Sequence, residues 1–379
     1  MRHIGKNLQG TRVILGLSGG VDSAVAAILL KERGADVQAL HMTNWEDDEV
    51  YCTAASDLQD ARKVCAQLDF PLHHVNFTRE YRARVFARFL DEYRAGRTPN
   101  PDVLCNREIK FGVFRDYAKR LGGELIATGH YARTRHAQGR TELLRARDLS
   151  KDQSYFLHAV SEHALAETVF PLGEMLKRQV REIAREYALD VHDKKDSTGI
   201  CFIGKRPFRE FLAGYLSAEP GPIQTPDGQM VGEHHGLMYY TLGQRQGLGI
   251  GGRKEFGNEP WYVAGKDPAS NSLVVVQGAH PLRFSAALLA NHASWVNDAP
   301  IALADGGSLR CTARIRYRQA DQACTIANAD DGKILVTFEE SQADVTPWQF
   351  AVFYVGERCL GGAVIEQVIR GEETLRKAG

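Results

Sequence analysis

A glycine-rich segment, Gly16-Leu-Ser-Gly-Gly-Val-Asp-Ser23, lies between an apolar run at residues 11–17 and an Ala- and Leu-rich stretch at residues 22–33. The run predicts a buried strand and the stretch predicts a helix. Glycine lets the backbone approach an anion closely, and the start of a helix presents N–H groups without intrahelical partners at its positive dipole end. The segment therefore indicates a phosphate or pyrophosphate site. The alternative is a plain tight turn with Asp22 as helix N-cap.

Two other nucleotide motifs are excluded. No Gly-Lys-Ser/Thr follows the glycines, so the segment is not a Walker loop. Gly247-Leu-Gly-Ile-Gly-Gly252 matches G-x-G-x-x-G, but no strand pattern precedes it and no helix pattern follows it. It does not indicate a dinucleotide site.

Short apolar strands alternate with helical patterns over the first half of the chain. Strands are expected at residues 35–42, 72–75 and 124–128, and helices at residues 56–68, 79–94, 106–121 and 174–187. Such alternation is typical of a parallel sheet. Gly and Pro punctuate the next part, and alternating apolar and polar residues follow. We expect an α/β fold with a parallel-sheet domain at 1–206, a small linking domain at 207–282 and an antiparallel β-barrel at 283–379.

The charges of the chain cancel, with 47 Lys and Arg against 47 Asp and Glu. A globally cationic nucleic-acid binder is excluded, and any such site must be local. The 44% share of hydrophobic residues excludes a disordered chain. The longest apolar run, Ala24–Leu30, is far shorter than the ~20 residues of a membrane span, and the first residues lack the apolar core of a signal peptide. We expect a cytoplasmic protein without membrane association.

Seven cysteines, with no Cys-x-x-Cys pair, argue against a disulfide framework or a zinc ribbon. Cys105 is expected at the start of a helix near Arg107 and Lys110, and Cys201 lies among Lys194, Lys195, Lys205 and Arg206. A helix start and nearby cations lower the pKa of a thiol, so both are candidate nucleophiles, although each has a buried, inert role as the alternative. Cys65 and Cys311 lie on apolar faces and are expected to be structural.

Arginines gather in two places. In the expected strand at residues 309–318 they lie on the face opposite Cys311, without an acidic residue, at Arg310, Arg314, Arg316 and Arg318. Residues 79–97 contain six Arg against three acidic residues. A solvated outer face is the ordinary explanation, but two such stretches beside a nucleotide-binding domain favour contacts with RNA phosphates.

Eight motifs, in order and over nearly the whole chain, make the sequence similar to the tRNA-specific 2-thiouridylase family of the PP-loop ATP pyrophosphatases. They are SGGVDS, NPDVLCN, ATGHYAR, KDQSYFL, DSTGICFIG, LGQRQGLGIGG, ARIRYR and TPWQFAVFY. The resemblance implies a PP-loop domain (adenine nucleotide alpha hydrolase-like), then the linking domain and the barrel. The last motif departs from the family, which has a small Gly-Gln-Ser where this chain has Trp348-Gln349-Phe350.

The resemblance also implies roles for particular residues. ATP would be held by Gly16, Leu17, Ser18, Gly19, Gly20, Val21, Asp22, Ser23, Met42 and Gly129. Cys105 would be the nucleophile and Cys201 the carrier of a persulfide. The target base would contact Asn100, Pro101 and Asp102. The rest of the tRNA would contact His130, Lys151, Asp152, Gln153, Arg316, Tyr317 and Gln349.

The implied reaction is ATP-dependent 2-thiolation of the wobble uridine in the tRNA anticodon. The C2 oxygen is a poor leaving group, so ATP first converts it to an adenylate with release of pyrophosphate. Sulfur from the persulfide then replaces it as AMP departs. We expect Mg²⁺ to neutralise the phosphates without dedicated protein ligands. The expected partners are tRNA and a persulfide-bearing sulfur donor protein, and the chain is expected to act as a monomer.

Two other functions fit part of the sequence. A PP-loop amidotransferase or ligase that adenylates a small molecule would use the Gly-rich loop but neither thiol, and its pyrophosphate release would not depend on tRNA. A non-catalytic RNA-binding protein that senses ATP would bind the nucleotide without turnover.

Overall fold

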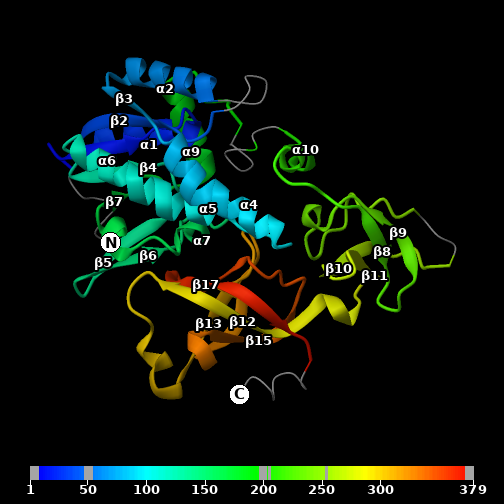
Figure 1. The fold of residues 1–379 in the computed structure, drawn as a ribbon. Coiled ribbons are helices and arrows are strands. Elements are labelled where there is room, and N and C mark those ends of the chain that lie inside the picture. Colours follow the sequence, from blue (N-terminus) through cyan, green and yellow to red (C-terminus); the bar gives the residue numbers. More distant parts are fainter. Residues whose placement is uncertain (1–7, 47–53, 196–202, 204–205, 252–254, 372–379) are drawn as a thin grey trace.

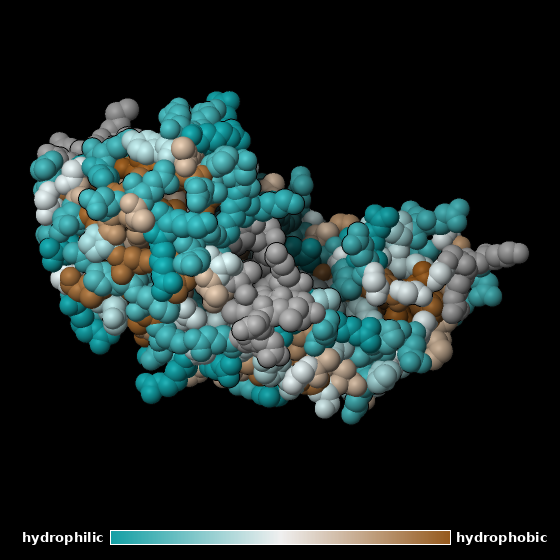
Figure 2. Space-filling model, turned by 90° about the horizontal axis from the view of Figure 1, so that it is seen from above, coloured by the Kyte–Doolittle hydropathy of each residue, from teal (hydrophilic) through white to brown (hydrophobic). Residues whose placement is uncertain are grey.

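The computed structural model describes residues 8–46, 54–195, 203, 206–251 and 255–371. Figure 1 shows an α/β unit at the N-terminal end, a small β unit to one side and a β-barrel beneath the α/β unit. Seen from above, the middle unit projects from the rest of the molecule as a separate lobe, and the visible surface is mostly hydrophilic (Figure 2). None of the described helices is long and apolar enough to cross a membrane.

The first unit is built on a five-stranded parallel sheet in the order β3-β2-β1-β4-β7. Its strands are β1 (Arg12–Gly16), β2 (Asp36–Thr43), β3 (Leu72–Asn76), β4 (Leu125–Thr128) and β7 (Thr168–Val169). Val13, Ile14 and Leu15 are each 0% exposed because helices cover both faces of the central strand. The predicted parallel-sheet domain is confirmed.

Helices surround this sheet. They are α1 (Val21–Glu32), α2 (Ala54–Leu68), α3 (Thr78–Tyr81), α4 (Ala87–Arg94), α5 (Pro101–Leu104), α6 (Phe114–Arg120), α7 (Ser154–Leu157), α8 (Glu162–Ala166) and α9 (Lys177–Glu186), and α10 (Phe208–Ala213) leads away from it. π-helical turns at Arg82–Phe86 and Cys105–Val113 join α3 to α4 and α5 to α6. The result is two long helices that lie side by side over one face of the sheet (Figure 1).

The helix that contains Cys105 begins one turn earlier than predicted. Instead of starting at Asn106 it starts at Pro101, with Asn100 as an extended N-cap. Proline is favoured at the first helical position because the N–H that it lacks would have no partner there. Cys105 therefore lies inside a continuous helix, and the argument that a helix start lowers the pKa of its thiol does not apply.

The middle unit is a four-stranded sheet in the order β10-β11-β8-β9. Its strands are β8 (Gly221–Gln224), β9 (Met230–His234), β10 (Trp261–Asp267) and β11 (Ser272–Gln277). A cluster of buried residues that includes Ile223, Val263 and Val275 forms its own core. The unit is therefore stabilised largely by its own packing, in addition to its contacts with the other units.

The last unit is an antiparallel barrel, as predicted. Its strands are β12 (Phe284–Trp295), β13 (Ser308–Arg314), β14 (Gln322–Asn328), β15 (Ile334–Ala343), β16 (Phe350–Val355) and β17 (Arg358–Ile369). The sheet closes because β12 pairs with both β15 and β17. The predicted strand at 309–318 ends at Arg314, so Arg316 and Arg318 lie beyond it.

A hairpin of the first unit extends the sheet of the barrel. β5 (Arg133–Ala137) pairs with β6 (Arg140–Leu144), and Leu143 and Leu144 of β6 pair with β17. The sequence pattern did not predict this pairing. The limits 1–206, 207–282 and 283–379 remain a prediction for the domains.

Candidate functional site

The Gly-rich loop leaves the C-terminal end of β1, in the centre of the sheet, and enters α1 at Val21. Gly19 has a φ of +79°, and a Cβ there would lie 2.2 Å from the backbone oxygen of Asp57. Gly20 is the N-cap of α1, and no described side chain caps this helix. The first N–H groups of α1 therefore remain suited to an anion.

Two serines hold the loop in shape. The Oγ atom of Ser23 accepts a hydrogen bond from the N–H of Ser18 (3.2 Å) and donates to the carbonyl of Gly20 (3.1 Å). The two serine hydroxyls lie 3.1 Å apart. These hydrogen bonds within the loop stabilise its curvature.

Two neighbouring strands close the sides of the loop. On β2, Nδ1 of His41 donates to the carbonyl of Leu17 (2.8 Å), and burial lowers the pKa of His41. Met42 follows on the same strand and is partly buried. After β4, a Cβ on Gly129 would lie 2.8 Å from the backbone nitrogen of Ser23, so only glycine fits there.

Two lysines that are distant in sequence reach the loop. Lys177, at the start of α9, donates to both carboxylate oxygens of Asp22 (2.7 and 2.8 Å), and the Tyr131 hydroxyl donates to the same carboxylate (2.8 Å). Lys194 donates to the carbonyl of Gly19 (3.0 Å). Burial opposes the Lys194 charge, but hydrogen bonds to Asp57 and Asp60 outweigh it and raise its pKa. Sequence reasoning missed both lysines at this site, because no spacing rule links them to the loop.

The long helix places Asp102 and Cys105 one turn apart. Cys105 is 4% exposed, and Asp102 is partly buried. Burial raises the pKa of Asp102, and the nearby Lys110 ammonium opposes part of this rise. A carboxyl group with a raised pKa holds its proton in a larger fraction near neutral pH, which suits proton transfer. Cys201 lies outside the described residues.

His130 connects this helix to the Gly-rich loop. Its Nδ1 lies 2.8 Å from the hydroxyl of Thr128, and its Nε2 lies 3.4 Å from Nζ of Lys110. Burial lowers the pKa of His130 well below its usual range, and Lys110 lowers it further, so the ring is neutral and Nε2 accepts from Lys110. Because Gly129 touches the loop and His130 touches the helix, the two predicted sites meet at the end of β4.

Residues 151–153 lie in the turn before α7. Asp152 is buried and accepts hydrogen bonds from the backbone N–H groups of Ala146 and Ser154 (3.0 and 3.2 Å). The side chain of Gln153 accepts from the N–H of Tyr131 (2.9 Å), and Lys151 is partly exposed. Asp152 and Gln153 therefore fix the turn, and the contact of all three residues with tRNA stays a prediction.

The barrel residues predicted to contact tRNA lie near the first and middle units. Arg316 is exposed and donates to the carbonyls of Leu242 and Asp344 (2.9 and 2.7 Å). The Tyr317 ring lies 4.3 Å from that of Phe156, measured between centroids. Gln349 donates to the carbonyl of Thr98 (2.6 Å), two residues before Asn100. The barrel thus contacts the segment that leads into the Asp102 helix.

Only part of the arginine face of the barrel is exposed to solvent. Arg314 is buried and donates to Asp321 and to Asp152 of the first unit (2.7 and 3.1 Å). The expectation of a solvated or RNA-binding Arg314 is therefore wrong, because the first unit covers this part of the strand. In the stretch 79–97, Arg84 and Arg88 are exposed, and neither forms an ion pair with a residue that the structure describes.

The other described cysteines are buried, as expected for Cys65 and Cys311. Burial raises the pKa of Cys65 to about 11 and that of Cys359 to about 12. The sulfur atoms of Cys311 and Cys324 lie 3.7 Å apart on adjacent strands. These thiols are poor nucleophiles in such surroundings.

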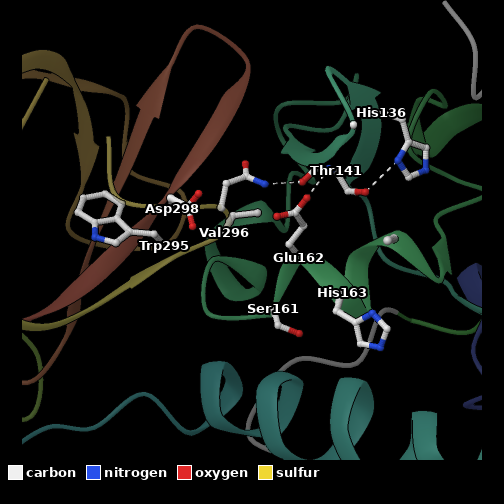
Figure 3. A pocket seen from close by; sticks show the side chains of 11 residues that line it. His136, Thr141, Ser161, Glu162, His163, Trp295, Val296 and Asp298 are labelled. Atoms are coloured by element: carbon white, nitrogen blue, oxygen red, sulfur yellow. Dashed lines mark hydrogen bonds between the residues drawn. The ribbon is translucent and has the colours of Figure 1, made fainter. Parts of the chain in front are cut away.

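A cavity of about 680 Å³ lies away from the predicted residues, between the β5–β6 hairpin, α8 and the end of β12. Thr141 is at its centre, hydrogen-bonded through its hydroxyl to His136 (2.8 Å) and through its N–H to Glu162 (2.8 Å) (Figure 3). These polar groups already bind one another, and none of the predicted site residues lines the cavity. We therefore place the candidate site at the Gly-rich loop.

Three family profiles match the chain in order. They are described as the tRNA methyl transferase HUP domain (residues 11–205), the tRNA methyl transferase PRC-barrel domain (209–277) and the aminomethyltransferase beta-barrel domain (285–365). The tRNA-specific 2-thiouridylase MnmA of Pseudomonas fluorescens (strain Pf0-1) is 59% identical over 358 residues, or 94% of each chain. That of Hahella chejuensis is 57% identical over 95% of this chain and 98% of its own.

Among solved structures, the U34-tRNA thiolase NcsA from Methanococcus maripaludis matches with a TM-score of 0.37 and 20% identity, over 56% of this chain and 67% of its own. A 4-thiouridine synthetase in complex with RNA and ATP matches with a TM-score of 0.34 and 17% identity, over 52% of this chain and 46% of its own.

A parallel sheet whose central strand leads through a glycine loop into an uncapped helix, followed by two β units, defines a multidomain nucleotide-binding α/β protein. At 55–59% identity over nearly the full length of its relatives, the chain belongs to the tRNA-specific 2-thiouridylase family. The resemblance drawn from the eight motifs is confirmed.

Proposed function

We propose that the chain is an ATP-dependent tRNA sulfurtransferase that replaces the C2 oxygen of the wobble uridine with sulfur. The junction at the end of β4 supports this most directly. Gly129 packs against the Gly-rich loop, while His130 accepts from Lys110 on the helix of Asp102 and Cys105. A nucleotide on the loop and a base beside the helix would be neighbours. The names of the curated relatives point to the same reaction.

In the proposed first step, the N–H groups at the start of α1 bind the ATP phosphates. Lys177 and Lys194 place positive charge beside them. The C2 oxygen of the uridine attacks the α-phosphorus, and pyrophosphate leaves. Mg²⁺ would offset the phosphate charge. We assign Mg²⁺ to the nucleotide phosphates and water, without dedicated protein ligands.

In the proposed second step, sulfur arrives as a persulfide on Cys201, supplied by a persulfide-bearing protein. The Cys105 thiolate attacks the inner sulfur of that persulfide, which forms a Cys105–Cys201 disulfide and releases hydrosulfide. Hydrosulfide adds to C2 and AMP departs with the former C2 oxygen. A cellular thiol then reduces the disulfide. Asp102 is suited to move the proton at the base, because burial raises its pKa.

Nucleoside mass spectrometry tests the proposal. The protein is prepared as a monomer and incubated with purified tRNA, ATP, Mg²⁺ and a persulfide-bearing protein. One uridine per tRNA should exchange oxygen for sulfur. A methylated product would instead support the activity in the family description, and pyrophosphate release that is independent of tRNA would support a small-molecule ligase.

Substitution of either reacting cysteine should stop sulfur transfer. We expect Cys105→Ser and Cys201→Ser each to abolish 2-thiouridine formation while ATP affinity stays unchanged, because neither residue belongs to the Gly-rich loop. ATP binding by calorimetry and product analysis by mass spectrometry check this. Cys65→Ser, a change at a buried structural thiol, is the matched control and should keep transfer activity. Full thiolation by either of the first two variants would contradict the two-cysteine scheme.

A further inference from the structure

The loop at residues 95–100 connects α4 to the helix of Asp102 and Cys105, and both other units contact it. From the barrel, Gln349 donates to the carbonyl of Thr98 (2.6 Å). From the middle unit, Nζ of Lys266 on β10 donates to the carbonyl of Gly96 (3.2 Å). The loop therefore lies between the two long helices (Figure 1) and accepts one hydrogen bond from each of the two β units.

Trp348 supplies a third attachment. The Arg97 guanidinium lies 4.0 Å from the centroid of the Trp348 ring, and the same guanidinium forms an ion pair with Glu92 on α4. Aromatic faces attract a cation at this separation. Arg97 is thereby held between α4 and the barrel. We call Trp348, Gln349 and Lys266 the loop clamp.

The backbone of Trp348 is strained. Its φ is +71°, a left-handed conformation that suits glycine and that a bulky residue rarely adopts. Its N–H donates to the carbonyl of Ile365 (2.7 Å), which helps to hold this conformation. Strain of this kind persists where the surroundings fix the residue, and it is concentrated at functional segments. The surrounding contacts therefore hold the indole ring over Arg97 although the backbone of Trp348 is strained.

We propose that the loop clamp positions residues 95–100 so that Asn100 and Asp102 face the uridine and Cys105 faces the sulfur carrier. This role rests on the proposed thiolation. Trp348 and Lys266 are positioning residues, since they contact the loop and none of the reacting groups. Asn100 follows Thr98 by two residues and occupies the N-cap position of the helix, so a shift of the loop moves the start of the helix directly. Misplacement by about 1 Å near reacting atoms costs up to about a hundredfold in rate.

The variant Trp348→Gly separates positioning from folding. Glycine relieves the positive φ, so the thermal stability should stay equal or rise. The single-turnover thiolation rate at saturating tRNA should nevertheless fall about tenfold or more, with less than about a threefold change in tRNA affinity. Trp348→Phe should restore most of the rate because a phenyl ring still receives Arg97. Ile301→Ala, at a barrel side chain that is 92% exposed, is the control and should leave rate and stability unchanged.

The energetic coupling between Arg97 and Trp348 provides a second test. Arg97→Ala and Trp348→Gly should each slow the reaction, and the double variant should be little slower than either, because both remove one contact. Hydrogen exchange of the amides of residues 95–105 should be faster in Trp348→Gly, and this readout does not depend on activity.

Three kinetic results would overturn the positioning role. They are a Trp348→Gly protein with the parental rate, additive effects of the two substitutions, and a rise in KM for tRNA at constant kcat. Unchanged hydrogen exchange would overturn it as well. Failure of the parental protein to thiolate tRNA would instead contradict the proposed function, and the exchange experiment would still decide whether the clamp holds the loop.

Discussion

At the scale of single residues, the Asp22 carboxylate lies at a site suited to phosphates and is compensated by Lys177. Removal of the lysine would leave a negative charge beside bound phosphates. We expect Lys177→Met to raise the Kd for ATP about tenfold, which corresponds to about 1.4 kcal/mol. Calorimetry with ATP measures this. Lys63→Met, which removes a surface lysine paired with Asp190, is the control and should bind ATP normally.

A compensating change sharpens this prediction. The double variant Asp22→Asn with Lys177→Met removes both charges and should regain part of the lost affinity. If Lys177→Met binds ATP as the parent does, the lysine has no electrostatic role at the loop.

Single residues also show where sequence reasoning was sufficient. The glycine positions could be predicted, because Gly19 and Gly129 lie where a Cβ would meet backbone atoms. Lys177 could not, because it is 155 residues from its partner Asp22 and only the folded chain brings them together. The surroundings of Arg314 were predicted wrongly for a related reason. Strand alternation tells which residues share a face, but it does not tell that Asp152 of another unit covers that face.

At the scale of elements, the long helix that ends at Arg94 carries two exposed arginines, Arg84 and Arg88. Arg84 and Arg88 are four residues apart, which places them on one side of the helix. We expect Arg84→Ala with Arg88→Ala to weaken tRNA binding for all tRNA sequences and to reduce the slope of log K against log salt by about one per arginine. Binding titrations at several salt concentrations measure this.

The control for this prediction is a paired arginine. Arg310 is exposed and already paired with Glu339, so Arg310→Ala should leave the salt slope almost unchanged. Equal slopes for the parent and the Arg84/Arg88 double variant would mean that this helix does not contact tRNA phosphates.

Elements show a second limit of prediction from sequence. The strands of the first unit could be predicted because a sheet that is buried on both faces requires continuous apolar runs, such as Val13, Ile14 and Leu15. The first turn of the Cys105 helix was missed because the helix was expected to begin only at residue 106, whereas Pro101 begins it. A proline marks a boundary, and the side on which the helix lies depends on the residues that pack there.

At the scale of the whole molecule, His158 lies between the first unit and the barrel. Its Nδ1 donates to the carbonyl of Tyr155 (2.7 Å), and its ring lies 4.9 Å from the ring of Phe350. Nε2 is buried without a hydrogen-bond partner among the described residues. Burial lowers the pKa of His158 from 6.5 to about 4.

This histidine predicts acid sensitivity. The unfolded chain takes up a proton near pH 6.5 and the folded chain only near pH 4, so acid favours unfolding between these values. The contribution of His158 to the free energy of unfolding should fall by about 2 kcal/mol between neutral pH and about pH 5. Urea unfolding at both pH values measures it. His158→Gln cannot titrate and should lose less stability on acidification, and an equal loss in both proteins would contradict the assignment.

The β5–β6 hairpin has a consequence for the order of synthesis. β6 belongs to the first unit, yet its partner strand contains Arg358 and Cys359, more than 200 residues later. During translation the hairpin leaves the ribosome early and keeps one edge without a partner until the end of the barrel emerges. Exposed strand edges promote association between chains. Folding of the nascent chain therefore remains incomplete until nearly the last strand is made, and this edge is where a chaperone would be most useful.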